Sequence, residues 1–143
     1  MQILVTGGAG FIGSHLCERL VKDGHMVTVL DNFSTGRASN LASLENSPSF
    51  ELVEGSILDL ETLKPLAEKA DYIFHLAAAV GVFNIVNNPL ASLLTNIRGT
   101  EHVLEAAHSS NKPVFLTSSS EVYGKNISDS LKESDDRILG SPV

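Results

Sequence analysis

Short apolar runs alternate along the chain with longer stretches in which apolar residues recur every three or four positions. The apolar runs predict five β-strands, at Ile3–Val5, Met26–Leu30, Phe50–Val53, Tyr72–Leu76 and Val114–Leu116. The helical spacing predicts helices over Phe11–Asp23, Leu60–Lys69 and Pro89–His108, and a short helix near Ala38–Leu44. Pro65 lies inside the second helix, where it predicts either a kink or a restart.

The order of these elements decides the fold class. Strands that are apolar throughout and separated by helices are typical of a parallel sheet that is covered on both faces. Connections between parallel strands are right-handed, so the helices are divided between the two faces. The sequence therefore predicts an α/β fold, a Rossmann-type doubly wound parallel sheet. The chain has 143 residues, and a domain usually has roughly 100–200 residues, so residues 1–143 are expected to form one domain.

Three glycines follow the first strand at intervals of three residues. Gly7 permits a tight turn, Gly10 leaves room for a diphosphate beside the backbone, and Gly13 lets the next helix pack against the sheet. Read alone, the three glycines could form nothing more than a tight turn. A strand precedes them and an amphipathic helix follows, and the N-terminus of that helix can bind phosphate through free backbone N–H groups.

An acidic residue after the second strand completes a dinucleotide site. Asp31 lies about 20 residues beyond the glycines, where a carboxylate accepts hydrogen bonds from the adenosine ribose. The same carboxylate repels the 2′-phosphate of NADP, whereas Arg37 nearby is the residue that could take that phosphate. We expect NAD to be the cofactor, with Arg37 a loop residue.

Composition and charge narrow the class of partner. The formal charge of −7 argues against binding to a nucleic-acid backbone, which requires a basic face. Apolar residues make up 43% of the chain, enough for a core, and no apolar run approaches the ~18 residues of a membrane span. Cys17 is the single cysteine, and the N-terminus does not resemble a signal peptide, so we expect a cytoplasmic protein without a membrane or nucleic-acid partner.

Later motifs point to a family. Asp31-Asn32-Phe33-Ser34-Thr35-Gly36 follows strand two, His75-Leu76-Ala77-Ala78 ends strand four, and Asn96-Ile97-Arg98-Gly99-Thr100 lies in the long helix. The run from Thr117 to Gly124 reads Thr-Ser-Ser-Ser-Glu-Val-Tyr-Gly. With the glycine turn, these motifs resemble the extended short-chain dehydrogenase/reductase family, in its branch of NAD-dependent nucleotide-sugar epimerases, dehydratases and decarboxylases. The resemblance spans residues 1 to about 140.

The resemblance implies a set of cofactor contacts. They are Gly7, Gly10, Phe11, Ile12, Gly13, Asp31, Asn32, Ser34, Thr35, Gly36, Ser56, Ile57, Leu76, Ala77, Ala78, Asn96, Thr117 and Ser118. Ala77 and Ala78 would lie flat beside the cofactor, or else be small core residues. Asn96 would stabilise the site from the central helix, or else face solvent. His75 is interpreted as a structural residue at the strand end, and no metal site is expected.

The resemblance also implies catalytic roles. Ser119 would hydrogen-bond the sugar hydroxyl that is oxidised, unless the serines form an ordinary loop. Glu121 matches a glutamate that decarboxylases and dehydratases use near sugar C5, although it also occurs in plain epimerases, where it supports the site. The expected reaction is a UDP-glucose 4-epimerase-like transient oxidation at C4. A UDP-glucuronate decarboxylase or nucleotide-sugar 4,6-dehydratase is one alternative, and a non-catalytic dinucleotide-binding module is another.

Two departures from the family pattern qualify the expectation. Gly55-Ser56-Ile57 stands where the family has Gly-Asp followed by an aliphatic residue, so Ser56 replaces an acid that accepts from adenine. Neither Tyr72 nor Tyr123 starts the family's Tyr-x-x-x-Lys motif. We expect a Rossmann domain truncated before that motif and before the substrate domain, inactive alone, within a parent enzyme that binds a nucleotide sugar. The helix at Pro89–His108 suggests a homodimer by the same resemblance.

Overall fold

Five strands and their connecting helices make up the computed structural model, which describes residues 1–125 and 130–140. The strands are β1 (Gln2–Thr6), β2 (Met26–Asp31), β3 (Phe50–Glu54), β4 (Tyr72–His75) and β5 (Val114–Leu116). The α-helices are α1 (Phe11–Lys22), α2 (Leu60–Lys69), α3 (Val82–Asn87), α4 (Pro89–Leu93) and α5 (Thr100–Ser109). A 3₁₀ segment η1 (Ala38–Leu44), a π-helical segment η2 (Leu94–Gly99) and a 3₁₀ turn η3 (Ser120–Tyr123) complete the described elements.

All five strands are parallel and follow the order β3-β2-β1-β4-β5. The chain winds outward from β1 to β3 and then crosses back to the other side of β1. The predicted Rossmann-type doubly wound sheet is therefore confirmed. Its winding reverses between β1 and β4, and in sheets of this kind the ligand crevice opens at the carboxyl ends of the strands beside such a switch point.

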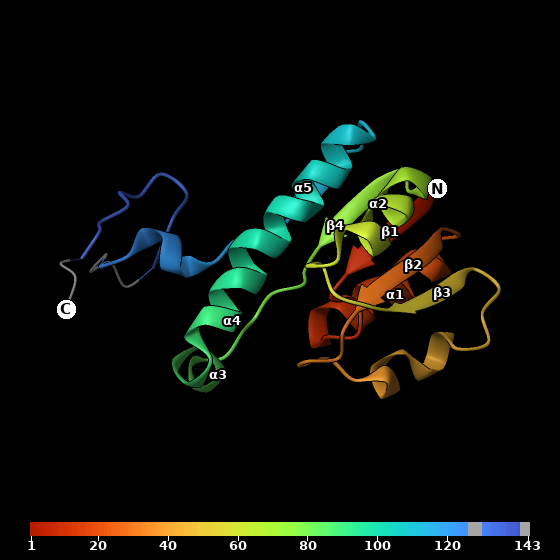
Figure 1. Cartoon of the computed structure of the whole chain (residues 1–143), viewed down its shortest axis with the longest axis horizontal. Coiled ribbons are helices and arrows are strands. Elements are labelled where there is room, and N and C mark those ends of the chain that lie inside the picture. The colour runs from red at the N-terminus through yellow and green to blue at the C-terminus, as the bar shows by residue number, and fades with distance from the viewer. Residues whose placement is uncertain (126–129, 141–143) are drawn as a thin grey trace.

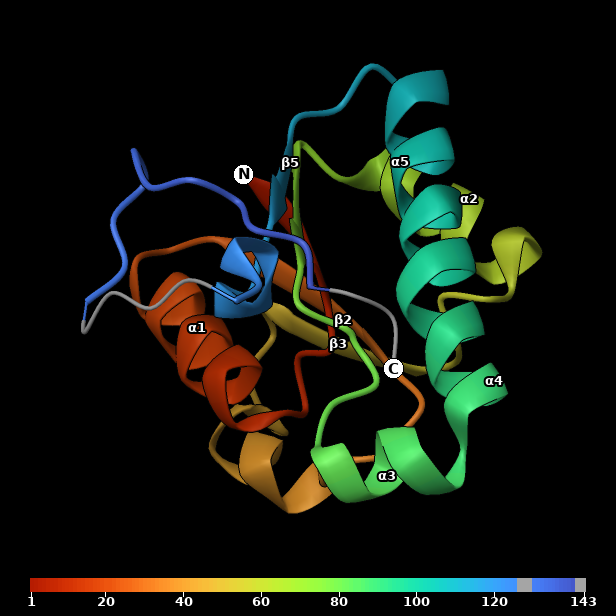
Figure 2. The ribbon, with the colours of Figure 1, turned by 90° about the vertical axis from the view of Figure 1, so that its left-hand side faces the viewer.

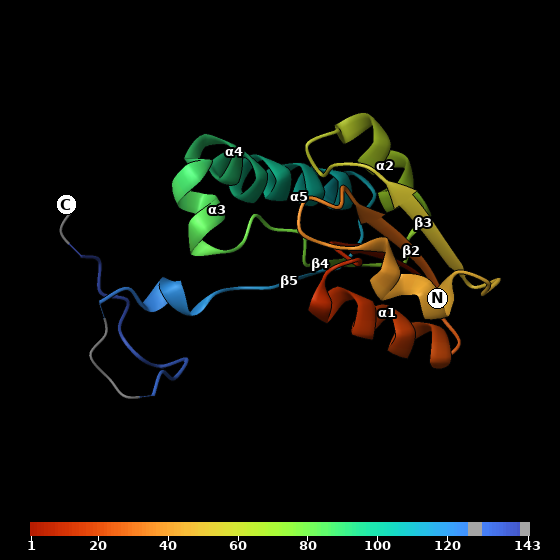
Figure 3. The ribbon, with the colours of Figure 1, turned by 90° about the horizontal axis from the view of Figure 1, so that it is seen from below.

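Helices cover both faces of the sheet, and each face has its own core (Figures 1 and 3). Leu4 and Leu30 pack with Leu63 and Val103 under α2 and α5. The neighbouring strand residues point the other way and pack under α1 and η1, where they meet Leu41 and Leu44: Ile3, Val5, Val27 and Val29. Because successive side chains alternate between two buried faces, the central positions of these strands are mostly apolar.

The predicted helices are present, with two differences in detail. Helix α2 continues through Pro65 instead of restarting there. Asp59 caps it by accepting from the N–H groups of Glu61 and Thr62, at 3.1 and 3.4 Å, which satisfies two donors of the first turn. The long helix expected over Pro89–His108 runs as α4, η2 and α5 in succession, with a π-helical turn at its centre. The long helix packs closely against Ile57 at Gly99. A Cβ on Gly99 would lie 2.4 Å from Ile57 Cδ1, so a side chain does not fit at this position.

The chain after β5 leads away from the sheet (Figure 1). Its described part folds back on itself, with Lys125 N–H donating to the carbonyl of Ile138 at 2.9 Å. Gly124 has φ +60°, and a Cβ there would collide with the Ile138 carbonyl oxygen. The fold therefore requires a glycine at the end of the Val-Tyr-Gly motif, because the segment at Gly124 and the segment at Ile138 approach each other closely.

A buried histidine joins the middle of the sheet to the long helix. His75 is only 2% exposed, with Nδ1 2.7 Å from Thr6 Oγ1 and Nε2 3.0 Å from Thr100 Oγ1. The Thr100 hydroxyl donates to the carbonyl of Asn96 at 2.8 Å, so it accepts from His75. The ring is therefore neutral with its proton on Nε2, and the Thr6 hydroxyl donates to Nδ1. His75 acts in the fold, as the sequence predicts.

Burial makes this histidine sensitive to acid. Desolvation lowers the pKa of His75 from 6.5 to about 4, so the unfolded chain takes up a proton that the folded chain refuses between these values. The folded state should thus lose up to about 3 kcal/mol as pH falls from 6.5 towards 4. Urea denaturation at pH 7, 6 and 5 measures the free energy of unfolding. A His75→Gln variant keeps every other titrating group, so its free energy of unfolding should not show the decrease with falling pH that His75 causes. Parallel pH dependences for the two proteins would contradict the assignment.

Candidate functional site

The candidate site lies where β1, β2 and β4 end, beside the switch point of the sheet. The glycine turn leaves β1 there and enters α1, and the segments after β2 and β4 flank it (Figure 2). Gly7 N–H donates to the carbonyl of Leu30 at 2.9 Å, which ties the turn to β2. Leu76 N–H donates to the carbonyl of Thr6 at 3.0 Å, which continues the sheet pairing on the other side.

Each glycine of the turn faces a different environment. Gly7 has φ +75°, and a Cβ there would lie 2.6 Å from Ala77 N. A Cβ on Gly13 would lie 2.3 Å from the carbonyl oxygen of Gly7, so α1 packs directly on the turn. A Cβ on Gly10 would meet only the Gly7 carbonyl oxygen, at 3.2 Å. Packing within the protein explains Gly7 and Gly13, whereas a Cβ on Gly10 would press on the Gly7 carbonyl oxygen and otherwise face open space.

Helix α1 begins at this open space with uncapped donors. Its N-cap is Gly10, which has no side chain, and no side chain of the described residues caps this end. The N–H groups of Phe11, Ile12 and Gly13 belong to the first turn, which has no intrahelical acceptor. The side chains of Phe11 and Ile12 are 79% and 68% exposed. Partial positive charge and free donors at one place suit an anionic ligand.

Asp31 links the glycine turn to the end of β2. It is 8% exposed, and its two carboxylate oxygens accept from the N–H groups of Ala9 at 2.9 Å and Phe33 at 2.8 Å. Each carboxylate oxygen has a second lone pair, which leaves acceptor capacity for a ligand hydroxyl. The buried thiol of Cys17 lies under this site, and burial together with the charge of Asp31 raises its pKa to about 12. Cys17 therefore stays a neutral thiol that packs in the core.

The loop after Asp31 turns sharply around the site. Phe33 has φ +54°, a conformation that bulky residues rarely adopt, and its ring packs against the core under α1. Asn32 Oδ1 accepts from Ser34 N–H at 3.1 Å, which closes the turn. Ser34 and Thr35 are exposed, and Gly36 packs against Ala9. These residues lie beside the glycine turn, and their contact with a cofactor stays a prediction.

Ser56 and Ile57 follow β3, and contacts with neighbouring residues fix their positions. Ser56 Oγ accepts from Leu58 N–H at 3.1 Å, and Ile57 is 4% exposed in the core beneath Gly99. The carbonyl of Ile57 accepts from His102 Nδ1 at 3.2 Å. The Ile57 side chain thus packs in the core rather than lining an open surface. Only a small part of it is left for contact with adenine. That burial depends on Gly99, some forty positions further along the chain.

Asn96 holds the segment after β4. Its Oδ1 accepts from Ala79 N–H at 2.7 Å and its Nδ2 donates to the Ala79 carbonyl at 3.1 Å. Asn96 is exposed, so it faces solvent while its side chain is hydrogen-bonded to the chain at Ala79, and its part in a cofactor site stays a prediction. Ala77 packs partly into the core under α2 and α5, whereas Ala78 is exposed. Asn96 fixes the path of the two alanines, and thereby one wall of the site.

The serine run follows β5 at the same edge of the sheet. Thr117 donates to the carbonyl of His75 through both its N–H, at 3.3 Å, and its hydroxyl, at 3.2 Å. Ser119 is the N-cap of η3 and accepts from Glu121 N–H at 3.2 Å. Ser118, Ser119 and Glu121 are exposed. No hydrogen bond of the described residues joins Ser119 or Glu121 to the glycine turn, so their catalytic roles stay predictions.

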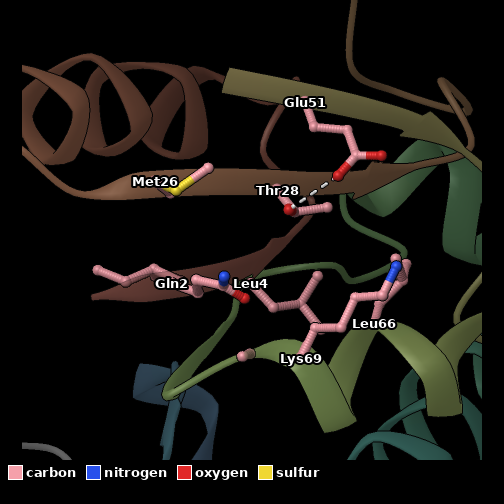
Figure 4. Close-up of a pocket in the computed structure, with 9 residues that line it drawn as sticks. Gln2, Leu4, Met26, Thr28, Glu51, Leu66 and Lys69 are labelled. Carbon is pink, nitrogen blue, oxygen red and sulfur yellow. Dashed lines mark hydrogen bonds between the residues drawn. The ribbon is translucent and has the colours of Figure 1, made fainter. Parts of the chain in front are cut away.

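A separate pocket lies at the opposite edge of the sheet. It is lined by residues at the amino ends of the strands and at the end of α2, including Gln2, Met26, Glu51 and Lys69 (Figure 4). Its place is opposite to that expected of a ligand crevice in an open parallel sheet. Within residues 1–125 and 130–140 no cluster of metal-ligating side chains occurs, and no helix there is long and apolar enough to cross a membrane.

Sequence reasoning missed two residues that shape the site. Asn40 donates from Nδ2 to the carbonyl of Ala9 at 2.8 Å, across 31 positions of sequence. Thr100 links Asn96 to His75. The sequence has no distinctive signal for Asn40, because its 3₁₀ segment also contains Ser39 and Ser43, and the role of Thr100 is visible only once the helix lies against β4.

Known proteins resemble the chain over almost all of its length. The family described as NAD dependent epimerase/dehydratase matches residues 3–141. A UDP-N-acetyl-alpha-D-glucosaminuronate decarboxylase from Bacillus cytotoxicus is 43% identical over 98% of this chain and 43% of its own length. A UDP-glucose 4-epimerase from Mycolicibacterium smegmatis is 47% identical over 87% of this chain and 41% of its own length.

A solved structure shows the same architecture. The dTDP-glucose 4,6-dehydratase from Streptomyces venezuelae, with NAD bound, superposes with a TM-score of 0.89 at 34% identity, over 97% of this chain and 46% of that one. The chain thus spans less than half the length of the proteins it matches. The resemblance predicted from the motifs is confirmed, as is NAD as the cofactor of the family. The chain belongs to the NAD-dependent epimerase/dehydratase family.

Proposed function

We propose that residues 1–143 bind NAD at the carboxyl edge of the sheet. The N–H groups of Phe11, Ile12 and Gly13 would hold the diphosphate, and the Asp31 carboxylate would accept from the adenosine ribose. The donor set fits the group, because uncapped donors suit phosphate and a buried carboxylate suits ribose hydroxyls. The carboxylate also disfavours the 2′-phosphate of NADP. Arg37 is exposed in the same loop and stays the residue that such a phosphate would meet.

One observation carries this proposal. Gly10 is the glycine of the turn that the protein's own packing constrains least, since an added Cβ would meet a single backbone atom, the Gly7 carbonyl oxygen, in a tight contact at 3.2 Å. A glycine that packing explains only in part, at the start of a helix with free donors, supports close approach of a ligand to the backbone.

For the parent protein we propose nucleotide-sugar 4-epimerase chemistry. NAD, when bound, supplies a hydride acceptor for the sugar C4 hydroxyl. Ser119 would accept or donate a hydrogen bond at that hydroxyl and so orient it. Asn96 would keep the wall at Ala77 and Ala78 in place. The relative from Mycolicibacterium smegmatis, a UDP-glucose 4-epimerase, supports this reading.

Glu121 favours a second enzyme class. Its exposed carboxylate follows Ser119 by two positions, where a decarboxylase or a 4,6-dehydratase of the family would place an acid or base near sugar C5. A decarboxylase and a dehydratase are among the similar proteins. A non-catalytic dinucleotide-binding module is the third reading, because residues 1–143 contain no Tyr-x-x-x-Lys motif.

We also propose a homodimer in the cytoplasm. A row of exposed apolar side chains follows α3, α4 and η2, formed by Val82, Phe83, Val86, Leu90, Leu93 and Ile97. An apolar surface of this extent on a helix is typical of a protein–protein contact. A single buried thiol fits a reducing compartment.

The cofactor site is tested by Gly10→Ala. The added methyl group requires a shift of only a few tenths of an ångström at the Gly7 carbonyl oxygen, but it occupies the approach to the helix N-terminus, so the Kd for NAD should rise at least tenfold. The free energy of unfolding should change by less than ~1 kcal/mol, the scale of an N-cap substitution. Calorimetric titration and urea denaturation measure the two effects.

Gly13→Ala is the matched control. Its Cβ would lie 2.3 Å from the Gly7 carbonyl oxygen, so this variant should lose folding stability as well as NAD affinity. If Gly10→Ala binds NAD as tightly as the chain without the substitution, the proposed site is wrong.

The reaction class is tested on the parent protein with NAD. Mass spectrometry of the product from a UDP-hexose should show an unchanged mass with an inverted C4 configuration. Loss of CO₂ from a UDP-glucuronate, or loss of water, would instead establish the alternative that Glu121 favours. Absence of turnover with every nucleotide sugar, despite NAD binding, would favour the binding module.

Sedimentation velocity tests the homodimer. The parent protein should sediment as a dimer, and Leu90→Glu should convert it to a monomer because a charge would be buried in the apolar contact. Leu139→Glu is the control, since Leu139 is 95% exposed and lies outside the row. A parent protein that is monomeric at micromolar concentration would rule out the dimer.

A further inference from the structure

Ala9 lies between two glycines of the turn, and both of its backbone polar groups are held by one distant segment. The residue is fully buried. Its N–H donates to Asp31, as described above. Its carbonyl accepts twice, from Arg37 N–H at 3.1 Å and from Asn40 Nδ2 at 2.8 Å. A carbonyl oxygen has two lone pairs, so this acceptor is fully used.

The peptide unit between Ala9 and Gly10 is therefore held at both ends. Its carbonyl faces the loop of residues 36–40, and its N–H, which belongs to Gly10, donates to the carbonyl of Gly7 at 3.2 Å. Gly10 is also the N-cap of α1. The orientation of this one peptide thus determines where the helix begins and where the free N–H groups point.

The loop that makes these contacts is itself anchored. Leu41 and Leu44 are buried in the core under α1, at 2% and 6% exposure. Ser43 donates to Glu18 of α1, a hydrogen bond that lowers the pKa of the Glu18 carboxyl. Gly36 packs closely on Ala9, since a Cβ there would lie 2.9 Å from the Ala9 carbonyl carbon. Asn40 therefore donates from a fixed support.

We propose that Asn40 is a positioning residue for the diphosphate-binding turn, holding the Ala9–Gly10 peptide so that the helix donors are arranged before the cofactor arrives. The proposal rests on the proposed NAD site. A preformed site binds more tightly because less conformational freedom is lost on binding. The effect should be larger for the diphosphate than for adenosine, because Asn40 donates to the Ala9 carbonyl next to the helix N-terminus, whereas the Asp31 carboxylate is also held by the N–H of Phe33.

Affinities for NAD, ADP and adenosine test the specificity of the effect. In Asn40→Ala the Kd values for NAD and for ADP should rise about five- to tenfold. In Asn40→Asp they should rise further, because a carboxylate would face the Ala9 carbonyl. Adenosine, which has no phosphate, should bind within twofold of the parent chain. Asn46→Ala is the matched control, an exposed asparagine just after η1, and should leave all three affinities unchanged.

Amide hydrogen exchange of the unliganded chain gives a second readout that needs no ligand. The hydrogen-bonded amides at the turn are those of Gly10 and Ser14, which donate to the carbonyls of Gly7 and Gly10 at 3.2 and 3.0 Å. They should exchange at least fivefold faster in Asn40→Ala than in the unsubstituted chain and in Asn46→Ala, with the β-strand amides unchanged. Unchanged exchange at Gly10 and Ser14, or an equal loss of adenosine and ADP affinity, would overturn the positioning role. A parent chain that binds neither NAD nor ADP would instead contradict the proposed function, while the exchange result would still decide the role of Asn40.

Discussion

The hydrogen bond from the Ala9 N–H to the Asp31 carboxylate is the contact on which the candidate site depends. It joins the glycine turn after β1 to the end of β2 at 2.9 Å, inside a region closed to water. A buried carboxylate that accepts from backbone N–H groups is stable only when those donors stay in place. The turn and the acid therefore support each other. The start of α1, the strained Phe33 and the packing of Gly36 all follow from bringing these two loops together.

A second set of contacts controls the opposite wall. His75 joins β1 to the long helix through Thr6 and Thr100, and Asn96 on that helix holds the chain at Ala79. Both ring nitrogens of His75 are paired, which is what allows that side chain to be buried, whereas Asn96 is exposed and holds Ala79 at the surface. The two walls meet at Gly7, where the turn approaches Ala77 too closely for any side chain. The site is thus a rigid edge of the sheet rather than a set of independent loops.

Local signals predict much of this structure. Short apolar runs predict the strands, and the helical spacing predicts the bounds of α2, which the structure confirms at Leu60–Lys69. The spacing of Gly7, Gly10 and Gly13 with Asp31 predicts where the turn lies. What the sequence does not contain is the contact that only the fold creates. The Asn40 bond to Ala9 and the burial of Ile57 beneath Gly99 each join segments that are far apart in the sequence, and the spacing of apolar residues does not reveal the π-helical segment that contains Asn96. Helix α3 was missed because its exposed apolar side chains show no single buried face.

Amide chemical shifts during a titration with NAD test the central claim most directly. If the uncapped start of α1 holds the diphosphate, the largest shift changes should fall on Phe11, Ile12 and Gly13, with a second group on the loop after Asp31. ADP should reproduce the first group, because it carries the same diphosphate. Saturable changes confined to other residues, for example those around Lys69 in the pocket at the opposite edge of the sheet, would contradict the account.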